Sequence, residues 1–166
     1  MNIVLIGYRG TGKSSVAGIL ADRLGWKHIS TDAEIIVRAQ QSIPDIVKAF
    51  GWDYFRNLES DVCRDVAGGD HLVIDTGGGA ILRSHNVDAL KGNGRLFWLT
   101  AEIPTIAQRI GGDTQRPSLT GTKSFVEEIA EVLAERGPQY SAAAHHVIPT
   151  DHVTVMQVAD SILALL

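Results

Sequence analysis

The sequence has only one cysteine, Cys63, among its 166 residues. One thiol cannot form a disulfide within the chain or supply the cysteines of a structural metal site, so both are excluded. The simpler interpretation of Cys63 is a small buried residue on a helix. Hydrophobic runs long enough to span a membrane are absent, as is a basic leader with a cleavage site. We therefore expect a cytoplasmic protein that does not contact a membrane.

An excess of basic residues is also missing, because the net charge is −4 at pH 7. A protein without a general positive field is not expected to bind nucleic acid, and any anionic ligand must be held by a local group of arginines. Repeats, low-complexity tracts and linkers are not apparent, and 166 residues suffice for one core. We predict a single domain over residues 1–166 and expect a monomer.

A phosphate-binding motif stands near the start of the sequence. Residues 7–14 read Gly-Tyr-Arg-Gly-Thr-Gly-Lys-Ser and fit the P-loop pattern G-x-x-x-x-G-K-[ST]. An apolar run at 2–6 precedes the motif and a helical pattern ending at Gly25 follows it, which is the strand–loop–helix context that the motif requires. A glycine-rich turn without a ligand is the alternative, and this context disfavours it. The sequence therefore predicts that a nucleoside triphosphate binds to Gly10, Thr11, Gly12, Lys13, Ser14 and Ser15.

Two residues of the pattern point to a magnesium ion beside the phosphates. In a P-loop, Lys13 reaches the β- and γ-phosphates and the Ser14 hydroxyl coordinates Mg²⁺. A third predicted strand, at 71–75, ends in Asp75, which is the form of a Walker B element whose acid helps to hold the ion. The alternative is that Asp75 only caps the glycine turn that follows it.

Short apolar segments alternate with helical patterns along the whole sequence. We predict a long helix from Phe125 into the 140s that is interrupted or bent near Gly137-Pro138, and a closing helix from Val153 to Leu166. Strands that alternate with helices form a parallel sheet with right-handed crossovers. The fold class is therefore α/β, with a five-stranded parallel sheet flanked by helices. The predicted strands are 2–6, 26–30, 71–75, 95–99 and 147–148.

Four polar features have two interpretations each. Asp32, after the second strand, is either a helix cap or a carboxylate at the ligand-binding edge of the sheet. The glycines at 77–79 form either a flexible turn or a place where backbone N–H groups approach a ligand. Arg56 and Glu59 lie three residues apart on one helix, and this segment alone favours an exposed ion pair of little energetic value. The glycine-rich segment 111–121 is either a mobile lid or an ordinary surface loop.

The motifs together resemble the shikimate kinase family, small P-loop kinases related in fold to nucleoside monophosphate kinases. After the P-loop come, in family order, Thr31-Asp32, Phe55-Arg56 with Glu59, Gly77-Gly78-Gly79, Arg116-Pro117, and Arg136 with Tyr140. The resemblance covers residues 1 to about 150. It implies a substrate-binding helical region at about 32–60 and a mobile lid at about 111–123. The activity that it implies is phosphorylation of the 3-hydroxyl of shikimate by ATP and Mg²⁺, giving shikimate 3-phosphate.

The resemblance also implies roles on the substrate side. Arg56 and Arg136 would hold the shikimate carboxylate, which suits the bidentate geometry of a guanidinium, and Glu59 would orient Arg56. Asp32 would bind ring hydroxyls and act as the general base or help to position it. Backbone N–H groups would come from Gly78 and Gly79.

On the nucleotide side, the resemblance implies that Lys13 and Arg116, together with Mg²⁺, supply positive charge to the transferred phosphoryl group. Arg116 would arrive with the lid, which excludes water. Arg109 would flank the adenine, because a planar guanidinium suits stacking.

Two positions depart from the family pattern. The family usually has an acid two residues before the substrate-binding Asp, where this chain has Ser30, and commonly has an Asp where this chain has Pro149. We hypothesise that Asp75 replaces the acid missing at Ser30 and orients the water shell of Mg²⁺. Two other functions stay open: a non-catalytic nucleotide-dependent binding or regulatory module on this fold, and a kinase for another small polyol acid such as gluconate.

Overall fold

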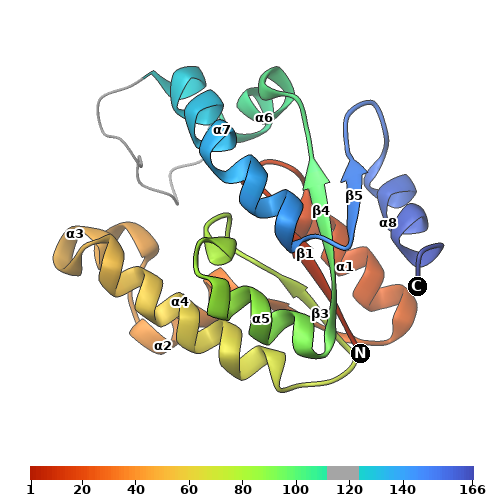
Figure 1. Ribbon diagram of the computed structural model, residues 1–166, viewed down its shortest axis with the longest axis horizontal. Helices are drawn as coiled ribbons and strands as arrows, with labels where there is room; N and C mark the ends of the chain where they lie inside the picture. The colour runs from red at the N-terminus through yellow and green to blue at the C-terminus, as the bar shows by residue number, and fades with distance from the viewer. Residues whose placement is uncertain (112–123) are drawn as a thin grey trace.

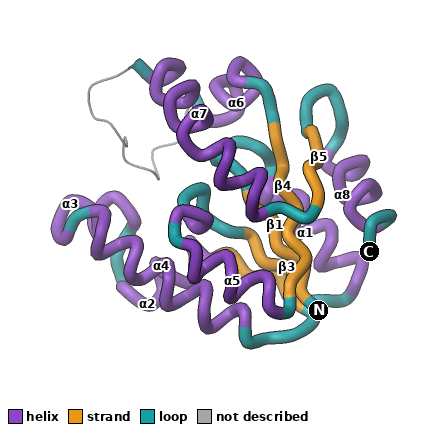
Figure 2. The backbone as a smooth tube through the Cα atoms, viewed as in Figure 1, coloured by secondary structure: helices purple, strands orange, loops and turns teal. Residues whose placement is uncertain are grey.

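The computed structural model describes residues 1–111 and 124–166. Its centre is a five-stranded parallel sheet in the order β2-β3-β1-β4-β5, which confirms the predicted fold class (Figure 1 and Figure 2). β1 lies in the middle, and all of its residues are buried. An unbroken apolar run is what a strand covered on both faces requires. The strands are β1 Asn2–Ile6, β2 Lys27–Ser30, β3 Leu72–Asp75, β4 Gly94–Thr100 and β5 His146–Pro149.

Helices cover both faces of the sheet (Figure 1). On one face, α1 (Lys13–Leu24) and α8 (Val155–Leu163) form a buried cluster with Ile3 and Leu5 of β1. On the other, α4 (Trp52–Ala67), α5 (Ser84–Gly92) and α7 (Phe125–Ala143) form a second cluster with Val4 and Ile6. Alternate residues of β1 thus point to opposite clusters, as the two-residue period of a strand requires.

The helices α2 (Thr31–Ala39) and α3 (Ile43–Phe50) lie with α4 at the left of Figure 1. Each begins at a serine cap, whose hydroxyl accepts a hydrogen bond from the backbone N–H three residues later. The Ser30 Oγ lies 3.2 Å from the Ala33 nitrogen, and the Ser42 Oγ lies 3.2 Å from the Asp45 nitrogen. These caps satisfy N–H groups that have no partner inside the helix, so they define where the two helices start.

Three helices differ from the prediction. α7 runs through Pro138 as one continuous helix, so of the two predicted outcomes the interruption does not occur. A proline removes one backbone hydrogen bond, but Arg136, Tyr140 and Ala143 are buried on both sides of it, and this packing keeps the segment helical. α8 is shorter than predicted because a capping box at Thr154 starts it and Ala164 ends it. α5 has no counterpart among the predicted elements.

Cys63 is buried in α4, as its sequence interpretation predicts. Burial raises the pKa of its thiol to about 12, and the charges of Glu59 and Asp32 contribute to this rise. A thiol with such a pKa stays protonated near neutral pH and is a poor nucleophile, so Cys63 acts as a small packing residue.

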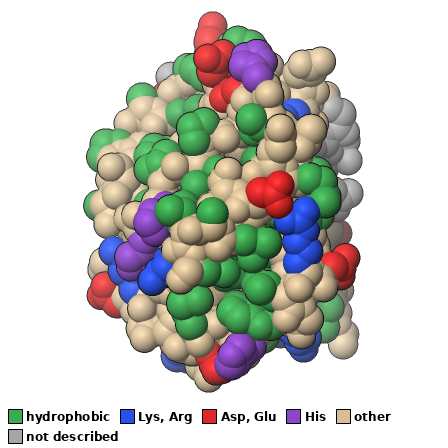
Figure 3. Space-filling model, turned by 90° about the vertical axis from the view of Figure 1, so that its right-hand side faces the viewer, with side chains coloured by type: hydrophobic (Ala, Val, Ile, Leu, Met, Phe, Trp, Pro, Cys, Tyr) green, Lys and Arg blue, Asp and Glu red, His purple; other side chains and the backbone are tan. Residues whose placement is uncertain are grey.

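The surface gives no sign of a general basic field on the face shown in Figure 3, where the described Lys and Arg side chains are scattered among hydrophobic, acidic and histidine side chains. Within residues 1–111 and 124–166, no helix has both the length and the apolar character needed to cross a membrane. The predicted lid, at about 111–123, lies outside the described residues apart from Gly111.

Candidate active site

A cavity of about 500 Å³ lies where β1, β2 and β3 end. Ligands of open parallel sheets bind at this edge, because the loops that follow the strands converge there. The walls come from the P-loop, the start of α2, the turn after β3 and the end of α6 (Ile103–Ile110). The lining residues are Arg9, Gly10, Gly12, Lys13, Ser14, Ser15, Ser30, Asp32, Ile36, Ile43, Asp75, Thr76, Gly77, Gly78, Arg109 and Ile110.

The P-loop follows β1 and leads directly into α1. Gly10 has a φ of +81°, and a Cβ atom there would lie 2.5 Å from Ile110 Cγ2, so this tight contact with α6 requires glycine. Gly12, with a φ of +92°, precedes α1 without any side-chain cap. The first N–H groups of α1 therefore have no side-chain acceptor and are suited to bind an anion.

Lys13 lies inside the loop rather than on the surface. Its Nζ donates to the carbonyl oxygens of Gly7 at 2.8 Å and Tyr8 at 3.0 Å. These bonds hold the ammonium over the cavity wall, where it can meet a phosphate oxygen. Of the residues assigned to ATP in this loop, only Thr11 is absent from the wall, because its hydroxyl is buried and donates to the Tyr8 carbonyl at 2.8 Å.

Arg109 closes the nucleotide side of the site. Its guanidinium donates to the Gly10 carbonyl and to the hydroxyl and carbonyl oxygens of Thr150, each at 3.1 Å. Thr150 follows Pro149, the last residue of β5, so Arg109 joins α6 to the loop after that strand. Beside this contact is a smaller hollow of about 220 Å³. It is lined by Thr11, Gly12, Ser15, Val16, Arg109, Thr150, Val153, Val155 and Val158.

Asp75 is buried at the end of β3 and faces the P-loop. Its Oδ2 accepts a hydrogen bond from the Ser14 hydroxyl at 2.5 Å, and His28 Nε2 lies 3.9 Å away. Burial raises the pKa of this carboxyl above its ordinary value, although Lys13, Ser14 and His28 act in the opposite direction. Among the described residues, no N–H group of the glycine turn donates to Asp75, so the capping role considered for it is not observed.

The sheet places Asp75 directly beside Ser30, because the two residues are register partners across β3 and β2. Ser30 itself caps α2. Hydroxyl and carboxylate oxygens are ligands that Mg²⁺ accepts, and Mg²⁺ usually keeps several waters and phosphate oxygens besides one or two protein groups. Ser14 and Asp75 fit such an ion. The described residues contain no group of three or more His, Cys, Asp or Glu side chains that could enclose a metal.

Asp32 lies in the first turn of α2 and lines the cavity. The preceding residue, Thr31, is fully buried, and its Oγ1 accepts a hydrogen bond from the Gly77 N–H at 3.0 Å. This bond fixes the glycine turn against α2, so the Asp32 carboxylate and the backbone of Gly77 and Gly78 belong to one wall.

Arg56 and Glu59 form a buried ion pair on α4, with 2.8 Å between Arg56 Nη1 and Glu59 Oε1. Glu59 is fully buried, so the interpretation as an exposed surface pair is wrong. The Arg56 guanidinium lies 5.3 Å from the Trp52 ring and 5.2 Å from the Phe55 ring. A Cβ atom on Gly79 would lie 2.2 Å from Arg56 Nη1, so glycine is required for this close packing. The arginine is therefore held by an ion pair, two aromatic rings and the glycine turn.

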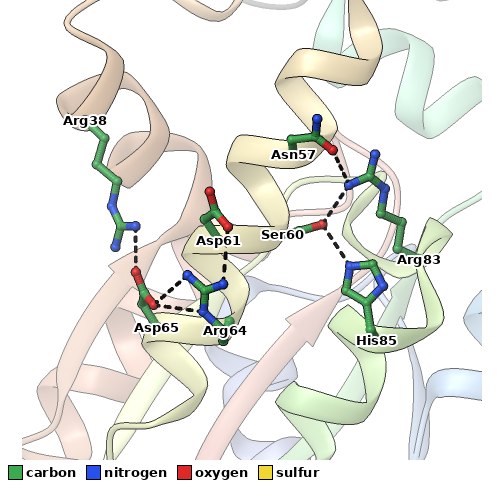
Figure 4. A network of polar contacts seen from close by, with 8 residues as sticks. All are labelled: Arg38, Asn57, Ser60, Asp61, Arg64, Asp65, Arg83 and His85. Atoms are coloured by element: carbon green, nitrogen blue, oxygen red, sulfur yellow. Dashed lines mark hydrogen bonds and ion pairs between the residues drawn. The ribbon is translucent and has the colours of Figure 1, made fainter.

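Polar contacts on the outer side of α4 keep the helix in place (Figure 4). Arg38 of α2 donates to Asp65 at 2.7 Å. Arg83, just after the 3₁₀ turn η1 (Ala80–Leu82), donates to Asn57 at 2.8 Å and to Ser60 at 3.1 Å. Because η1 follows the glycine turn, these contacts tie that turn to the helix that carries Arg56.

Arg136 is buried in α7 beside the same turn. A Cβ atom on Gly78 would lie 3.7 Å from Arg136 Nη1. Burial lowers the pKa of this guanidinium, and the nearby charge of Arg56 lowers it further. Arg56, Arg136 and Gly79 are not part of the described cavity wall. Gly78 is part of that wall, and Arg136 lies next to it. The structure thus brings two arginines together beside the glycine turn, whose Gly77 and Gly78 line the P-loop cavity.

Sequence reasoning missed several residues of this site. Arg9 occupies a variable position of the P-loop, yet its side chain lines the cavity; its place inside the motif was the available signal. Ile36, one turn after Asp32, and Thr76 line it as well. Arg116, assigned to catalysis and to ATP, lies outside the described residues.

Comparison with known proteins finds shikimate kinases that match nearly the full length of the chain. The sequence model of the family described as shikimate kinase matches residues 9–166. Shikimate kinase of Nitratidesulfovibrio vulgaris is 42% identical over 99% of this chain and 94% of its own length. Shikimate kinase of Symbiobacterium thermophilum is 39% identical over 98% and 94%.

Solved structures agree with these sequence matches. Shikimate kinase from Acinetobacter baumannii, in complex with shikimate, has a TM-score of 0.94 and 33% identity, covering 99% of this chain and 91% of that one. A gluconokinase from Sinorhizobium meliloti has a TM-score of 0.57 and 17% identity, which indicates a shared fold alone. Given the family match and the relatives that align over nearly its full length, the chain belongs to the shikimate kinase family.

Proposed function

We propose that this protein transfers the γ-phosphoryl group of ATP to the 3-hydroxyl of shikimate. One observation carries the proposal: a P-loop cavity and a buried pair of arginines both adjoin the same glycine turn. The P-loop suits a nucleoside triphosphate, and the arginines suit a substrate that carries a carboxylate. Shikimate has a carboxylate at one end of its ring and hydroxyls at the other, and the Acinetobacter baumannii relative binds it.

On the donor side, the N–H groups at the start of α1 and the Lys13 ammonium bind the β- and γ-phosphates. Arg109 and the smaller hollow beside Thr150 receive the adenine. The Ser14 hydroxyl would coordinate Mg²⁺ and Asp75 would orient its water shell, and the ion would neutralise charge on the phosphates. The predicted contribution of Arg116 rests on the family resemblance alone.

On the acceptor side, the guanidinium groups of Arg56 and Arg136 grip the carboxylate. The buried Glu59 keeps Arg56 oriented, and N–H groups of Gly78 and Gly79 contact the ring substituents. Because the arginines are fixed before the substrate arrives, little side-chain entropy is lost on binding, and the 3-hydroxyl is aimed at the P-loop.

The chemical step then needs one base and good alignment. The 3-hydroxyl oxygen forms a bond to the γ-phosphorus as the bond from that phosphorus to the β-phosphate oxygen breaks and ADP leaves. The hydroxyl proton passes to the Asp32 carboxylate, which lines the cavity between the donor side and the acceptor side. Lys13 stabilises the negative charge on the oxygens of the transferred group.

The two other functions are less well supported. A non-catalytic module would not need Lys13 and Asp32 at one cavity, or an arginine pair at the glycine turn beside it. A gluconate kinase shares the fold, but the similarity to the Sinorhizobium meliloti enzyme does not extend to function at this identity. A monomeric state and a cytoplasmic location remain predictions.

A coupled assay of ADP release separates these functions. The parent protein should consume ATP with shikimate and not with gluconate or without an acceptor. The Lys13→Ala variant should lose this activity, because an ammonium is removed from the phosphates. ATP consumption that is independent of shikimate, or specific to gluconate, would refute the proposed substrate.

Replacing either Arg56 or Arg136 with lysine should raise the KM for shikimate by roughly tenfold, because a lysine keeps the charge but loses the bidentate hydrogen bonds. The KM for ATP should stay within about twofold. Steady-state kinetics with both substrates varied would measure this. Arg95→Lys is the matched control and should change neither constant, because Arg95 lies at the start of β4, bonds to the Leu165 carbonyl and is not part of the described cavity wall. A shikimate KM unaffected in both site variants would rule out the arginine pair as the carboxylate site.

Shikimate binding should change the fluorescence of Trp52, whose ring lies 5.3 Å from the Arg56 guanidinium. Titration of the parent protein and of Trp52→Phe with shikimate would separate the signal of Trp52 from the signals of Trp26 and Trp98. The change should be absent in Trp52→Phe. An identical signal in the two proteins would place the responding tryptophan elsewhere.

A further inference from the structure

Tyr140 is the largest fully buried side chain, and it lies one helical turn after Arg136 on α7. Residues four apart share one face of a helix, so both side chains point toward the glycine turn. The Tyr140 ring stacks on Trp98 of β4, with 5.4 Å between ring centroids and an interplanar angle of 21°. A phenylalanine would pack equally well there. The hydroxyl therefore needs its own explanation, because a buried polar group costs free energy unless it is hydrogen-bonded.

The hydroxyl group donates to the carbonyl oxygen of Gly78. Gly78 is the point at which the cavity wall and the arginine pair meet. A Cβ atom on this glycine would lie 3.6 Å from the Tyr140 oxygen and 3.7 Å from Arg136 Nη1. Tyr140, Arg136 and the Gly78 backbone are thus packed around one spot, and α7 is joined to the turn after β3 through the tyrosine oxygen.

The two arginines are held in different ways. Arg56 has the buried carboxylate of Glu59 as its partner. Within residues 1–111 and 124–166, no carboxylate forms an ion pair with Arg136. Its Nη1 atom and the Tyr140 oxygen instead lie against the same side of Gly78, and the nearby Tyr140 counteracts the lowering of the Arg136 pKa by burial and by Arg56. A carboxylate partner would neutralise the guanidinium before the substrate arrives. A neutral hydroxyl orients it and leaves its charge available to an anion.

We propose that the Tyr140 hydroxyl is a positioning group for the substrate carboxylate, because it links Arg136 to the Gly78 backbone and fixes the guanidinium without neutralising it. This inference rests on the proposed function, in which Arg136 binds that carboxylate. It assigns to Tyr140 a contribution to shikimate affinity that acts through Arg136, with no direct part in phosphoryl transfer.

The test is Tyr140→Phe, which keeps the ring stack and removes one oxygen. The shikimate KM should rise about tenfold, the effect of losing one hydrogen bond to a charged group, while kcat and the KM for ATP stay within about twofold. The inhibition constant of the carboxamide analogue of shikimate should not change, since it lacks the anion. Equal weakening of shikimate and of the carboxamide would mean a purely structural role and would overturn the inference.

A double-mutant cycle with Arg136→Lys makes the route of action explicit. If Tyr140 acts through Arg136, adding Tyr140→Phe to Arg136→Lys should raise the KM little beyond the single lysine variant. Additive effects contradict the inference. A parent protein that does not use shikimate overturns the proposed function and this inference together, whereas a parental KM in Tyr140→Phe overturns this inference alone.

A measurement on the parent chain decides the matter if Tyr140→Phe does not fold. In protein labelled with 3-fluorotyrosine, the Tyr8→Phe and Tyr54→Phe variants assign the three fluorine resonances. Saturating shikimate should shift the Tyr140 resonance, and the carboxamide analogue should shift it less. No difference between the two ligands would exclude coupling between Tyr140 and the carboxylate.

Discussion

Replacing Asp32 with asparagine should lower kcat by a factor on the order of 10²–10⁴, the usual cost of losing a general base. Asparagine keeps the shape of the side chain and its place in the first turn of α2, but it cannot accept the proton of the 3-hydroxyl. The KM for ATP should change little, because the phosphates are bound by the P-loop. Single-turnover measurements with saturating substrates would isolate the chemical step from product release.

The matched control for this variant is Asp88→Asn, which removes a carboxylate from the exposed side of α5 and should have the parental kcat. A near-parental kcat in Asp32→Asn would remove its assignment as the base. Asp32 would then only position the ring hydroxyls, and the variant should show its effect in the KM for shikimate.

The sheet and most of its helices could be predicted because their signals are local. An apolar run such as β1 is bounded by the glycine of the P-loop, and Gly25 marks the end of α1 directly. α5 escaped prediction because Val87 and Leu90 are its only large apolar residues, too few to establish a helical period. The helix α7 continues through Pro138 without interruption, since its buried face outweighs one missing hydrogen bond.

The candidate site was harder to predict from local patterns. Arg56 and Glu59 look like a surface pair in their own segment, and only the packing of Gly79 and the surrounding helices buries them. The family resemblance supplied the assignment of Arg56 and Arg136, but not the distances or the asymmetry between their partners. The hydrogen bond between Gly77 and Thr31 joins residues 46 positions apart, and the one between Tyr140 and Gly78 joins residues 62 positions apart. No local sequence pattern contains either bond.

The departure at Ser30 leads to the second large effect, which concerns Mg²⁺. Where the family resemblance leads us to expect an acid, this chain has a serine that caps α2, and its register partner on the next strand is Asp75. We expect the carboxylate to have moved by one strand. Asp75→Ala should therefore raise the Mg²⁺ concentration that gives half-maximal activity by about 10–100-fold. This is the usual loss of metal affinity when a group that orients a metal's ligands is removed.

The double variant Ser30→Asp/Asp75→Ala should recover much of the parental Mg²⁺ midpoint. The exchange returns a carboxylate to the neighbouring strand end, and aspartate caps a helix as well as serine does, so α2 should be preserved. Ser42→Asp/Asp75→Ala is the matched control, because Ser42 is also a helix cap but is not part of the described cavity wall. It should behave like Asp75→Ala.

A titration of activity against Mg²⁺ at fixed ATP distinguishes the possible results. If Ser30→Asp restores the Mg²⁺ midpoint of Asp75→Ala and Ser42→Asp does not, the ion binds at the ends of β2 and β3. If Asp75→Ala itself keeps the parental midpoint, the carboxylate has no role in holding the ion. The hydrogen bond from Ser14 to Asp75 would then serve only to orient the Ser14 hydroxyl, and the ion would depend on Ser14, the phosphates and water.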